Sequence, residues 1–132
     1  MAYYSIYVPG EPVAKARPRV GKQNHIYTPK KTLAHESKIR EEWRENYLDP
    51  PSKNLVSLSI RFYLTRPKKI PKDFPEYPGK RPDIDNLIKT VLDALNGLAY
   101  EDDKQVIKIK ARKEWSPTPE GVGYTVIEVR EV

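Results

Sequence analysis

Residues 54–65 carry the pattern that most constrains the fold, because apolar and polar side chains alternate along them from Val56 onward. Alternation places successive side chains on opposite faces of an extended strand, so this segment predicts a strand with one buried face. The inward side chains are Val56, Leu58, Ile60, Phe62 and Leu64, and the outward ones are Ser57, Ser59, Arg61, Tyr63 and Thr65. A strand of this kind needs a layer that covers its apolar face.

The other segments predict the elements that complete this arrangement. Residues 3–8 read as a strand with Tyr4, Ile6 and Val8 on one face, and further strands are expected at 104–115 and 122–130. A polar helix is expected from Thr28-Pro29 to about Leu48, with Leu33, Ile39, Trp43 and Tyr47 as its buried anchors. Residues 10–27 and the Pro-rich 67–82 are expected to be loops. The sequence therefore predicts one α+β domain over residues 1–132, in β-α-β-α-β-β order, with two helices on a mixed four-stranded sheet.

The second helix has well-marked ends. Asp83 suits the N-cap, Pro82 disfavours an earlier start, and Asn96-Gly97 supplies the stop. Asp85 and Lys89 lie one turn apart on the polar side of this helix. Its apolar stripe consists of Ile84, Leu87, Ile88, Val91, Leu92 and Leu95.

Carboxylates gather at both ends of this helix. Asp83 and Asp85 stand at its start, and Asp102-Asp103 follow its end. Taken singly, these residues have ordinary explanations as a cap, a surface ion pair and a turn. Bringing all of these carboxylates together in the fold would cost free energy, because clustered carboxylates repel one another unless a cation neutralises them. Oxygen ligands of this kind suit Mg²⁺ or Mn²⁺, so the sequence predicts a metal site.

The strand after the acidic pair indicates which member faces the helices. Ile107, Ile109 and Ala111 alternate with lysine and arginine, which predicts that odd-numbered side chains point inward. Carried backwards, this parity favours Asp103 over Asp102 as the third metal ligand.

The residues around this helix closely resemble the RusA family of Holliday junction resolvases. The resemblance rests on the run from Arg81 to Gly97, on Asp102-Asp103-Lys104-Gln105-Val106, and on the segments Lys15-Ala16-Arg17-Pro18-Arg19 and Tyr27-Thr28-Pro29. It implies that Asp83, Asp85 and Asp103 bind divalent metal and that Lys89 is needed for cleavage. It also implies a homodimer. Some members carry a second basic residue just before the first aspartate, where this chain has Pro82.

The charge distribution suits a nucleic-acid substrate. The chain has a net charge of +6, with +5 over residues 10–31, +5 over residues 61–81 and −4 over residues 83–105. Each basic run alone is typical of a solvated loop, but basic loops around an acidic metal site favour a phosphodiester substrate. The predicted DNA contacts are Lys15, Arg17, Arg19, Arg66, Lys68, Lys69, Lys80 and Arg81.

Several side chains outside these segments allow two interpretations. Tyr3, Tyr7 and Tyr63 would share the sheet face opposite the helices, which is either solvated or a partner surface. Phe74 and Tyr77 either pin the Pro-rich loop to the body or stack on unpaired bases. His25 and His35 lack metal-ligand spacing and are expected to be surface polar residues.

The expected function is that of an endodeoxyribonuclease that resolves Holliday junctions by paired nicks in recombination and repair. Its expected metal is Mg²⁺, with Mn²⁺ as the alternative. Four-way DNA is the expected partner, and two symmetric nicks favour a homodimer. With no cysteine and no apolar run of membrane-spanning length, the protein is expected to be soluble and cytoplasmic. A non-catalytic DNA-binding or regulatory protein, and a nuclease for other branched DNA, remain alternatives.

Overall fold

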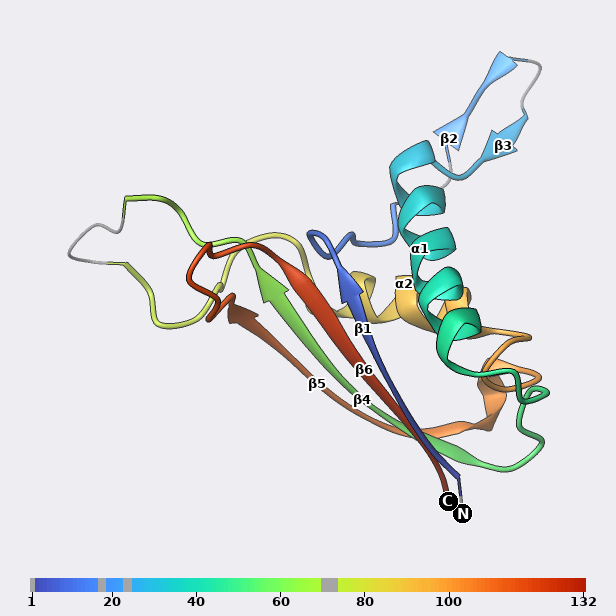
Figure 1. The fold of residues 1–132 in the computed structure, drawn as a ribbon. Coiled ribbons are helices and arrows are strands. Elements are labelled where there is room, and N and C mark those ends of the chain that lie inside the picture. Colours follow the sequence, from blue (N-terminus) through green and yellow to red (C-terminus); the bar gives the residue numbers. More distant parts are fainter. Residues whose placement is uncertain (1, 17–18, 23–24, 70–73) are drawn as a thin grey trace.

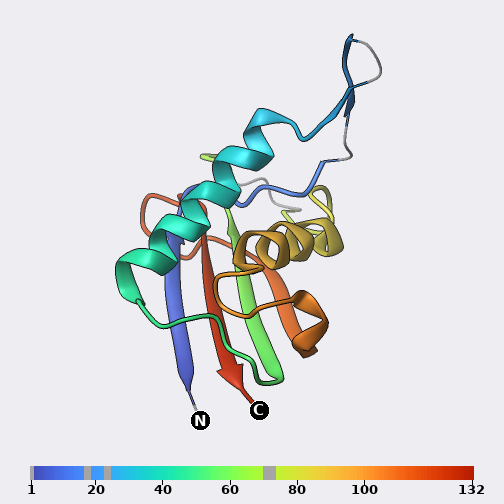
Figure 2. The same cartoon turned by 90° about the vertical axis from the view of Figure 1, so that its right-hand side faces the viewer.

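Two helices cover one face of a mixed four-stranded sheet (Figures 1 and 2). The computed structural model describes residues 2–16, 19–22, 25–69 and 74–132. The elements are β1 (Tyr3–Pro9), β2 (Arg19–Val20), β3 (Ile26–Tyr27), α1 (Lys30–Asn46), β4 (Val56–Leu64), α2 (Ile84–Leu95), the 3₁₀ helix η2 (Asp103–Gln105), β5 (Val106–Trp115) and β6 (Tyr124–Glu131). The predicted β-α-β-α-β-β order of the main elements is confirmed.

The sheet has the strand order β1-β6-β4-β5. The β1–β6 and β6–β4 pairs are antiparallel, whereas β4 and β5 are parallel. A parallel pair needs a crossover connection, and α2 supplies it between β4 and β5.

The core lies between the inner sheet face and the two helices. All five inward side chains predicted for β4 are buried, as are Tyr4, Ile6 and Val8 of β1. Trp43 of α1 packs with Tyr4 at a ring distance of 5.2 Å, and Tyr47, which follows the end of α1, packs edge-on against Tyr4 at 4.7 Å. The predicted alternation of both strands is therefore confirmed.

Helix α2 follows the prediction closely. It begins after Asp83 and ends before Asn96, and Gly97 adopts the left-handed φ of 78° that a helix stop requires. Leu87, Val91 and Leu95 are buried, while Asp85 and Lys89 are exposed.

Three expectations around α1 are wrong. Residues 10–27 are not wholly loop, because β2 and β3 form a two-stranded hairpin that projects from the start of α1 (Figure 1). Pro29 is itself the capping residue of α1 rather than its first helical residue. Leu33 is 48% exposed, because the buried face of α1 runs through Thr32, His35, Glu36, Ile39 and Trp43.

His35 is accordingly buried rather than a surface residue. Burial, and then the nearby charge of Lys38, lowers the pKa of His35. His25 is exposed, as expected.

Strand β5 departs from strict alternation at its start. The register shifts between Val56 and Ser57 of β4, which pair with Val106 and Lys108 of β5, so Ile107 has no partner. Val106 and Ala111 pack against the core, while Ile107 is 55% exposed. The inward parity therefore cannot be carried back through this bulge to Asp103.

Within the described ranges, no helix is both long enough and apolar enough to span a membrane.

A candidate active site at the start of helix α2

Asp83 and Asp85 present their carboxylates at the N-terminal end of α2. The carbonyl oxygen of Asp83 accepts the Leu87 amide at 3.1 Å, so its backbone starts the helix. Its side chain caps no amide of this helix, and Asp83 and Asp85 are both exposed. Asp85 accepts only the amide of Asn86, at 2.9 Å, among the described residues. The positive end of the helix dipole favours two carboxylates here. Because both side chains are exposed and only one Asp85 oxygen accepts an amide, oxygens of both residues can bind a cation.

A hollow of about 750 Å³ opens beside Asp83. Asn86 and Arg81 line it from the α2 side, Lys31 from the start of α1, and Glu11 from the N-terminal segment. Glu11 is already held by the Thr65 amide at 3.0 Å. Lys31 and Asn86 were not among the predicted site residues, although Lys31 belongs to a basic segment and Asn86 to the family-like run.

The segment that leads into Asp83 is held by Lys113 of β5. The Lys113 ammonium donates to the carbonyl oxygens of Lys80 at 2.8 Å and Pro82 at 2.9 Å. Lys113 pairs with Phe62 and so stands on the inner face of the sheet. Sequence reasoning missed this contact, though a lysine at an inward position of β5 was the available signal.

Lys89 lies one turn beyond Asp85 and is exposed. No hydrogen bond or ion pair of Lys89 occurs among the described residues, so its ammonium is available to a substrate. It follows Asp85 on the same side of α2, as predicted.

Lys15 has a structural position in this fold. Its ammonium lies 3.2 Å from a Glu36 oxygen and 3.1 Å from an Asp93 oxygen, and its amide donates to Asn86 at 2.8 Å. Burial acts to lower the pKa of Lys15, but hydrogen bonds to Asp93 and Glu36 outweigh it and raise that pKa. Lys15 therefore ties the N-terminal segment to both helices, and its predicted DNA contact stays a prediction.

The second acidic pair lies at the other end of the helix. Asp102 caps η2: its carboxylate accepts the Lys104 amide at 2.9 Å, and its own amide donates to the Gln105 side-chain oxygen at 2.8 Å. Asp103 takes no part in this capping box and is exposed. The Asp102 carboxylate is engaged in capping and that of Asp103 is not, which favours Asp103 over Asp102 as a metal ligand. Strand parity no longer supports this choice, because of the register shift in β5.

Asp103 is the first residue of η2, which follows the end of α2 in the chain. The Tyr100 hydroxyl donates to Leu92 at 2.9 Å. Burial raises the pKa of Tyr100 above its usual range, and the nearby Asp103 and Asp93 carboxylates raise it further. Leu92 lies seven residues beyond Asp85, roughly 10 Å along the helix axis. Asp83 and Asp85 stand at the start of α2 and Asp103 follows its end, so the two acidic groups belong to opposite ends of this helix in the chain.

The described part of a single chain contains no group of three or more His, Cys, Asp or Glu side chains placed to hold a metal ion. Mg²⁺ is bound by few carboxylates and keeps several waters, so Asp83 and Asp85 fit as a partial site. Asp83, Asp85 and Asp103 do not form such a group among the described residues of one chain, and their shared metal site stays a prediction.

Three of the predicted DNA contacts surround a second hollow, of about 410 Å³, in the Pro-rich loop. Lys69, Lys80 and Arg81 line it together with Phe74 and Trp115. Phe74 packs on Trp115 at a ring distance of 4.8 Å, so this residue pins the loop to β5. Tyr77, in contrast, is 58% exposed.

The remaining basic candidates differ in their surroundings. Lys68 is exposed beside Lys69. Arg66 donates to the Thr118 carbonyl at 2.6 Å and holds the turn before β6. Arg19 lies in β2, and Arg17 lies outside the described residues. Among the predicted DNA contacts whose side chains the structure describes, the loop cations are exposed, whereas Lys15 and Arg66 are partly buried.

Comparison with known proteins agrees with this arrangement. The family model described as Endodeoxyribonuclease RusA matches residues 9–129. A protein of Bacillus subtilis (strain 168), named Uncharacterized protein YqaN, is 32% identical over 128 residues, which cover 88% of this chain and 89% of the relative. The family match extends over the acidic helix, its two flanking basic segments, β4, β5 and most of β6. The chain belongs to the RusA family of endodeoxyribonucleases.

Proposed function

We propose that this chain is a divalent-metal-dependent endonuclease that resolves four-way DNA junctions by paired nicks. The observation that carries the proposal is the pair of exposed carboxylates, Asp83 and Asp85, at a helix start beside a hollow that Lys31 and Arg81 help to line. Family membership supports the reaction class. A surface that only bound DNA would gain nothing from carboxylates at this place, since they repel phosphates.

Each residue of the site has a separate part in this proposal. Asp83 and Asp85 would hold Mg²⁺ or Mn²⁺, which supplies Lewis-acid activation of the scissile phosphate and of water. Lys89, one turn further along α2, places a positive charge where charge develops on the phosphate oxygens. Lys68, Lys69, Lys80 and Arg81 would bind the DNA backbone next to the cut.

The position of Asp103 favours a site shared between two chains. Two nicks across a two-fold symmetric junction require two sites, which a C2 dimer provides. In a C2 interface each contact occurs twice, so Asp103 of one chain can complete the Asp83–Asp85 pair of the other while the reverse occurs at the second site. This arrangement reconciles the implied three-aspartate set with the absence of such a set among the described residues of one chain.

The experiment that tests the function compares a labelled four-way junction with a linear duplex of the same sequence, each with Mg²⁺. Wild type should nick the junction symmetrically and leave the duplex intact. Asp83→Asn, Asp85→Asn and Asp103→Asn should each abolish nicking but retain junction binding. Asp102→Asn is the matched control, because its carboxylate caps η2 and is expected to affect stability more than cleavage.

The incomplete acidic set in one chain is also what a non-catalytic DNA-binding or regulatory protein would show. Junction binding without any nicking by wild type, in Mg²⁺ and in Mn²⁺, would favour that alternative. Nicking of flaps or replication forks in preference to four-way junctions would instead identify a nuclease for other branched DNA.

A further inference from the structure

The outer face of the sheet, opposite the helices, carries an ordered set of basic and hydroxyl side chains. The strand register places these side chains in rows across the sheet. The first row contains Tyr3, Arg130, Ser57 and Lys108; the second contains Ser5, Glu128, Ser59 and Lys110; the third contains Tyr7, Val126, Arg61 and Arg112. Cations thus form a column along β5, and the tyrosines stand on β1 at the opposite edge.

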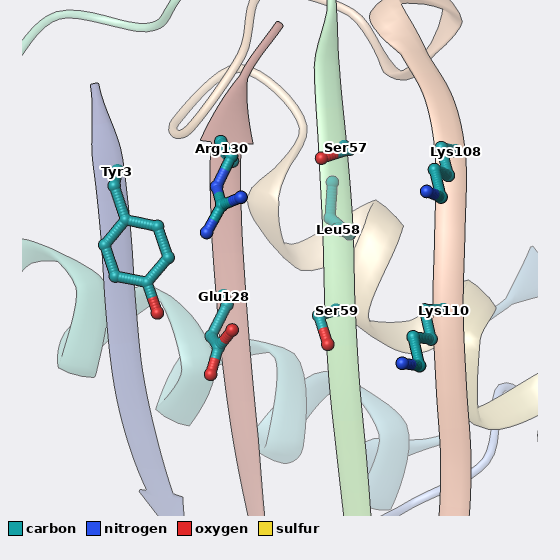
Figure 3. Close-up of a pocket in the computed structure, with 8 residues that line it drawn as sticks. All are labelled: Tyr3, Ser57, Leu58, Ser59, Lys108, Lys110, Glu128 and Arg130. Carbon is teal, nitrogen blue, oxygen red and sulfur yellow. The ribbon is translucent and has the colours of Figure 1, made fainter. Parts of the chain in front are cut away.

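The first two rows enclose a shallow depression of about 250 Å³, shown in Figure 3. Ser57 and Ser59 of β4 are short and form its floor, while Lys108 and Lys110 rise from β5 on one side. In Figure 3 both lysine side chains lean toward the serines of β4, and Arg130 stands on β6 at the other side. Hydroxyl and ammonium donors around one depression are suited to phosphate oxygens.

The cations of this face are largely uncompensated. Glu128 lies 3.3 Å from Arg61 and so is engaged by that residue. Lys108, Lys110, Arg112 and Arg130 are exposed, and none forms an ion pair within the described ranges. Lysines on an edge strand also discourage edge-to-edge aggregation, which explains part of β5. That explanation does not extend to Arg130 on the interior strand β6 or to the serine floor on β4.

The basic part of this face, formed by Lys108, Lys110, Arg112 and Arg130, is poorly suited to self-association. A C2 interface brings the same patch of both copies together, so it would bury like charges against like charges. A polyanion, in contrast, matches the cation column in charge. Single-stranded nucleic acid also matches the tyrosines at the other edge. Arg130 lies 5.3 Å from the Tyr3 ring centroid and Tyr7 packs on Tyr124 at 5.0 Å, yet Tyr3 and Tyr7 remain 49% and 54% exposed and offer ring surface to unpaired bases.

We propose that the outer sheet face binds a single strand of nucleic acid. The backbone runs along β5 on Lys108, Lys110 and Arg112, which recur about 6.7 Å apart along the strand. The bases extend over Ser57 and Ser59 toward Tyr3 and Tyr7 of β1, about 14 Å away across three strand spacings. The helices lie on the other side of the sheet (Figure 2), and residues at the starts of both helices line the Asp83 hollow, so this strand is distinct from the DNA at the cut. In assigning the ligand as nucleic acid, the inference deepens the proposed nuclease function and rests on it.

The test measures binding by the full-length protein without divalent metal, so that cleavage does not contribute. Fluorescence anisotropy of a labelled single-stranded oligonucleotide is followed over a salt series for wild type, Lys108→Gln/Lys110→Gln and Tyr3→Leu/Tyr7→Leu. Lys53→Gln is the control, since Lys53 is exposed on the segment before β4. Losing two phosphate contacts should flatten the slope of log affinity against log salt by roughly 1.4 units for a single strand.

The expected result is weaker single-strand binding in both double variants, with the flattened slope only in the lysine variant. Binding of a linear duplex should change much less in the tyrosine variant. Unchanged single-strand affinity in both variants would overturn the proposal, and an equal loss for duplex would overturn its single-strand assignment. A halved sedimenting mass of Tyr3→Leu/Tyr7→Leu would show instead that the face joins two copies. Junction nicking by wild type is scored separately, so that failure of the nuclease function and failure of this surface give different results.

Discussion

Removing the Lys113 ammonium should disturb the site without touching any of its carboxylates. Lys113→Met keeps most of the apolar stem and deletes the two hydrogen bonds to Lys80 and Pro82, at 2.8 and 2.9 Å. Hydrogen bonds to a charged donor contribute about 1.5–3 kcal/mol each when buried. One of these two is exposed to water, so we expect a combined loss of about 2 kcal/mol in the free energy of unfolding.

For a domain of this size that loss corresponds to a fall of about 6–10 °C in the melting midpoint. Junction nicking should fall further than stability implies, because Asp83 follows Pro82 directly and a shift of about 1 Å in a catalytic group can cost about 100-fold in rate. The assay is single-turnover nicking at a temperature where the variant remains folded by circular dichroism. Lys53→Met is the matched control, an exposed lysine outside this segment.

Two results would refute this reasoning. A wild-type melting midpoint together with wild-type nicking would show that Lys113 neither stabilises the loop nor positions Asp83. A lowered midpoint with unchanged nicking would show that the contact stabilises the loop but does not position Asp83.

Three further predictions concern other residues of the site and core. Lys89→Ala should slow nicking by about 10²–10³-fold with unchanged DNA binding and melting midpoint, since it removes a transition-state charge; loss of folding would make the residue structural. Alanine at Lys68, Lys69, Arg17 or Arg19 should each flatten the slope of log duplex affinity against log salt by about one unit. Arg66→Ala should mainly lower the melting midpoint, because Arg66 holds Thr118. A wild-type slope in all of these variants would place the DNA path elsewhere. His35 should make stability depend on pH: its folded pKa is lowered by burial, so the unfolded state binds the proton more readily, and stability should decline as pH falls below about 6.5 toward the folded pKa. Chemical denaturation of wild type and His35→Gln between about pH 7 and 5.5 checks this, and an equal decline in both proteins would contradict it.

The larger elements were predictable because their periodicity extends over many residues. The alternation in β1 and β4 and the apolar stripe of α2 each repeat several times, and the structure confirms their buried faces. The β2–β3 hairpin has two residues per strand, which is too short to establish any period.

Two local errors have separate physical causes. His35 lies four residues before Ile39 and eight before Trp43, so helical spacing alone would have placed it on the buried face of α1. Ile107 was assigned inward because strict alternation was assumed, but a register shift in β5 moves that residue out of the pattern. A bulge of one residue leaves no clear mark in composition.

The candidate site was predictable in its residue types but not in its assembly. Asp83, Asp85 and Lys89 share one helix, whose periodicity fixes their relative positions. Asp103 lies beyond a turn, and sequence spacing says nothing about which copy of the chain it serves. Lys113 was missed because its partners are backbone carbonyl oxygens, which the sequence does not display.

A mixing experiment tests most directly whether two chains share each nuclease site. Asp83→Asn and Asp103→Asn proteins are unfolded together, refolded as an equal mixture and assayed for junction nicking with Mg²⁺. In a shared site, a mixed dimer places both substitutions at one site and leaves the other intact, so the mixture should regain about a quarter of wild-type nicking although each variant alone is inactive. If each chain built its own site, every site in the mixed dimer would carry one substitution, and the mixture would remain inactive. An inactive mixture whose mixed dimers are verified by mass would therefore contradict the shared site.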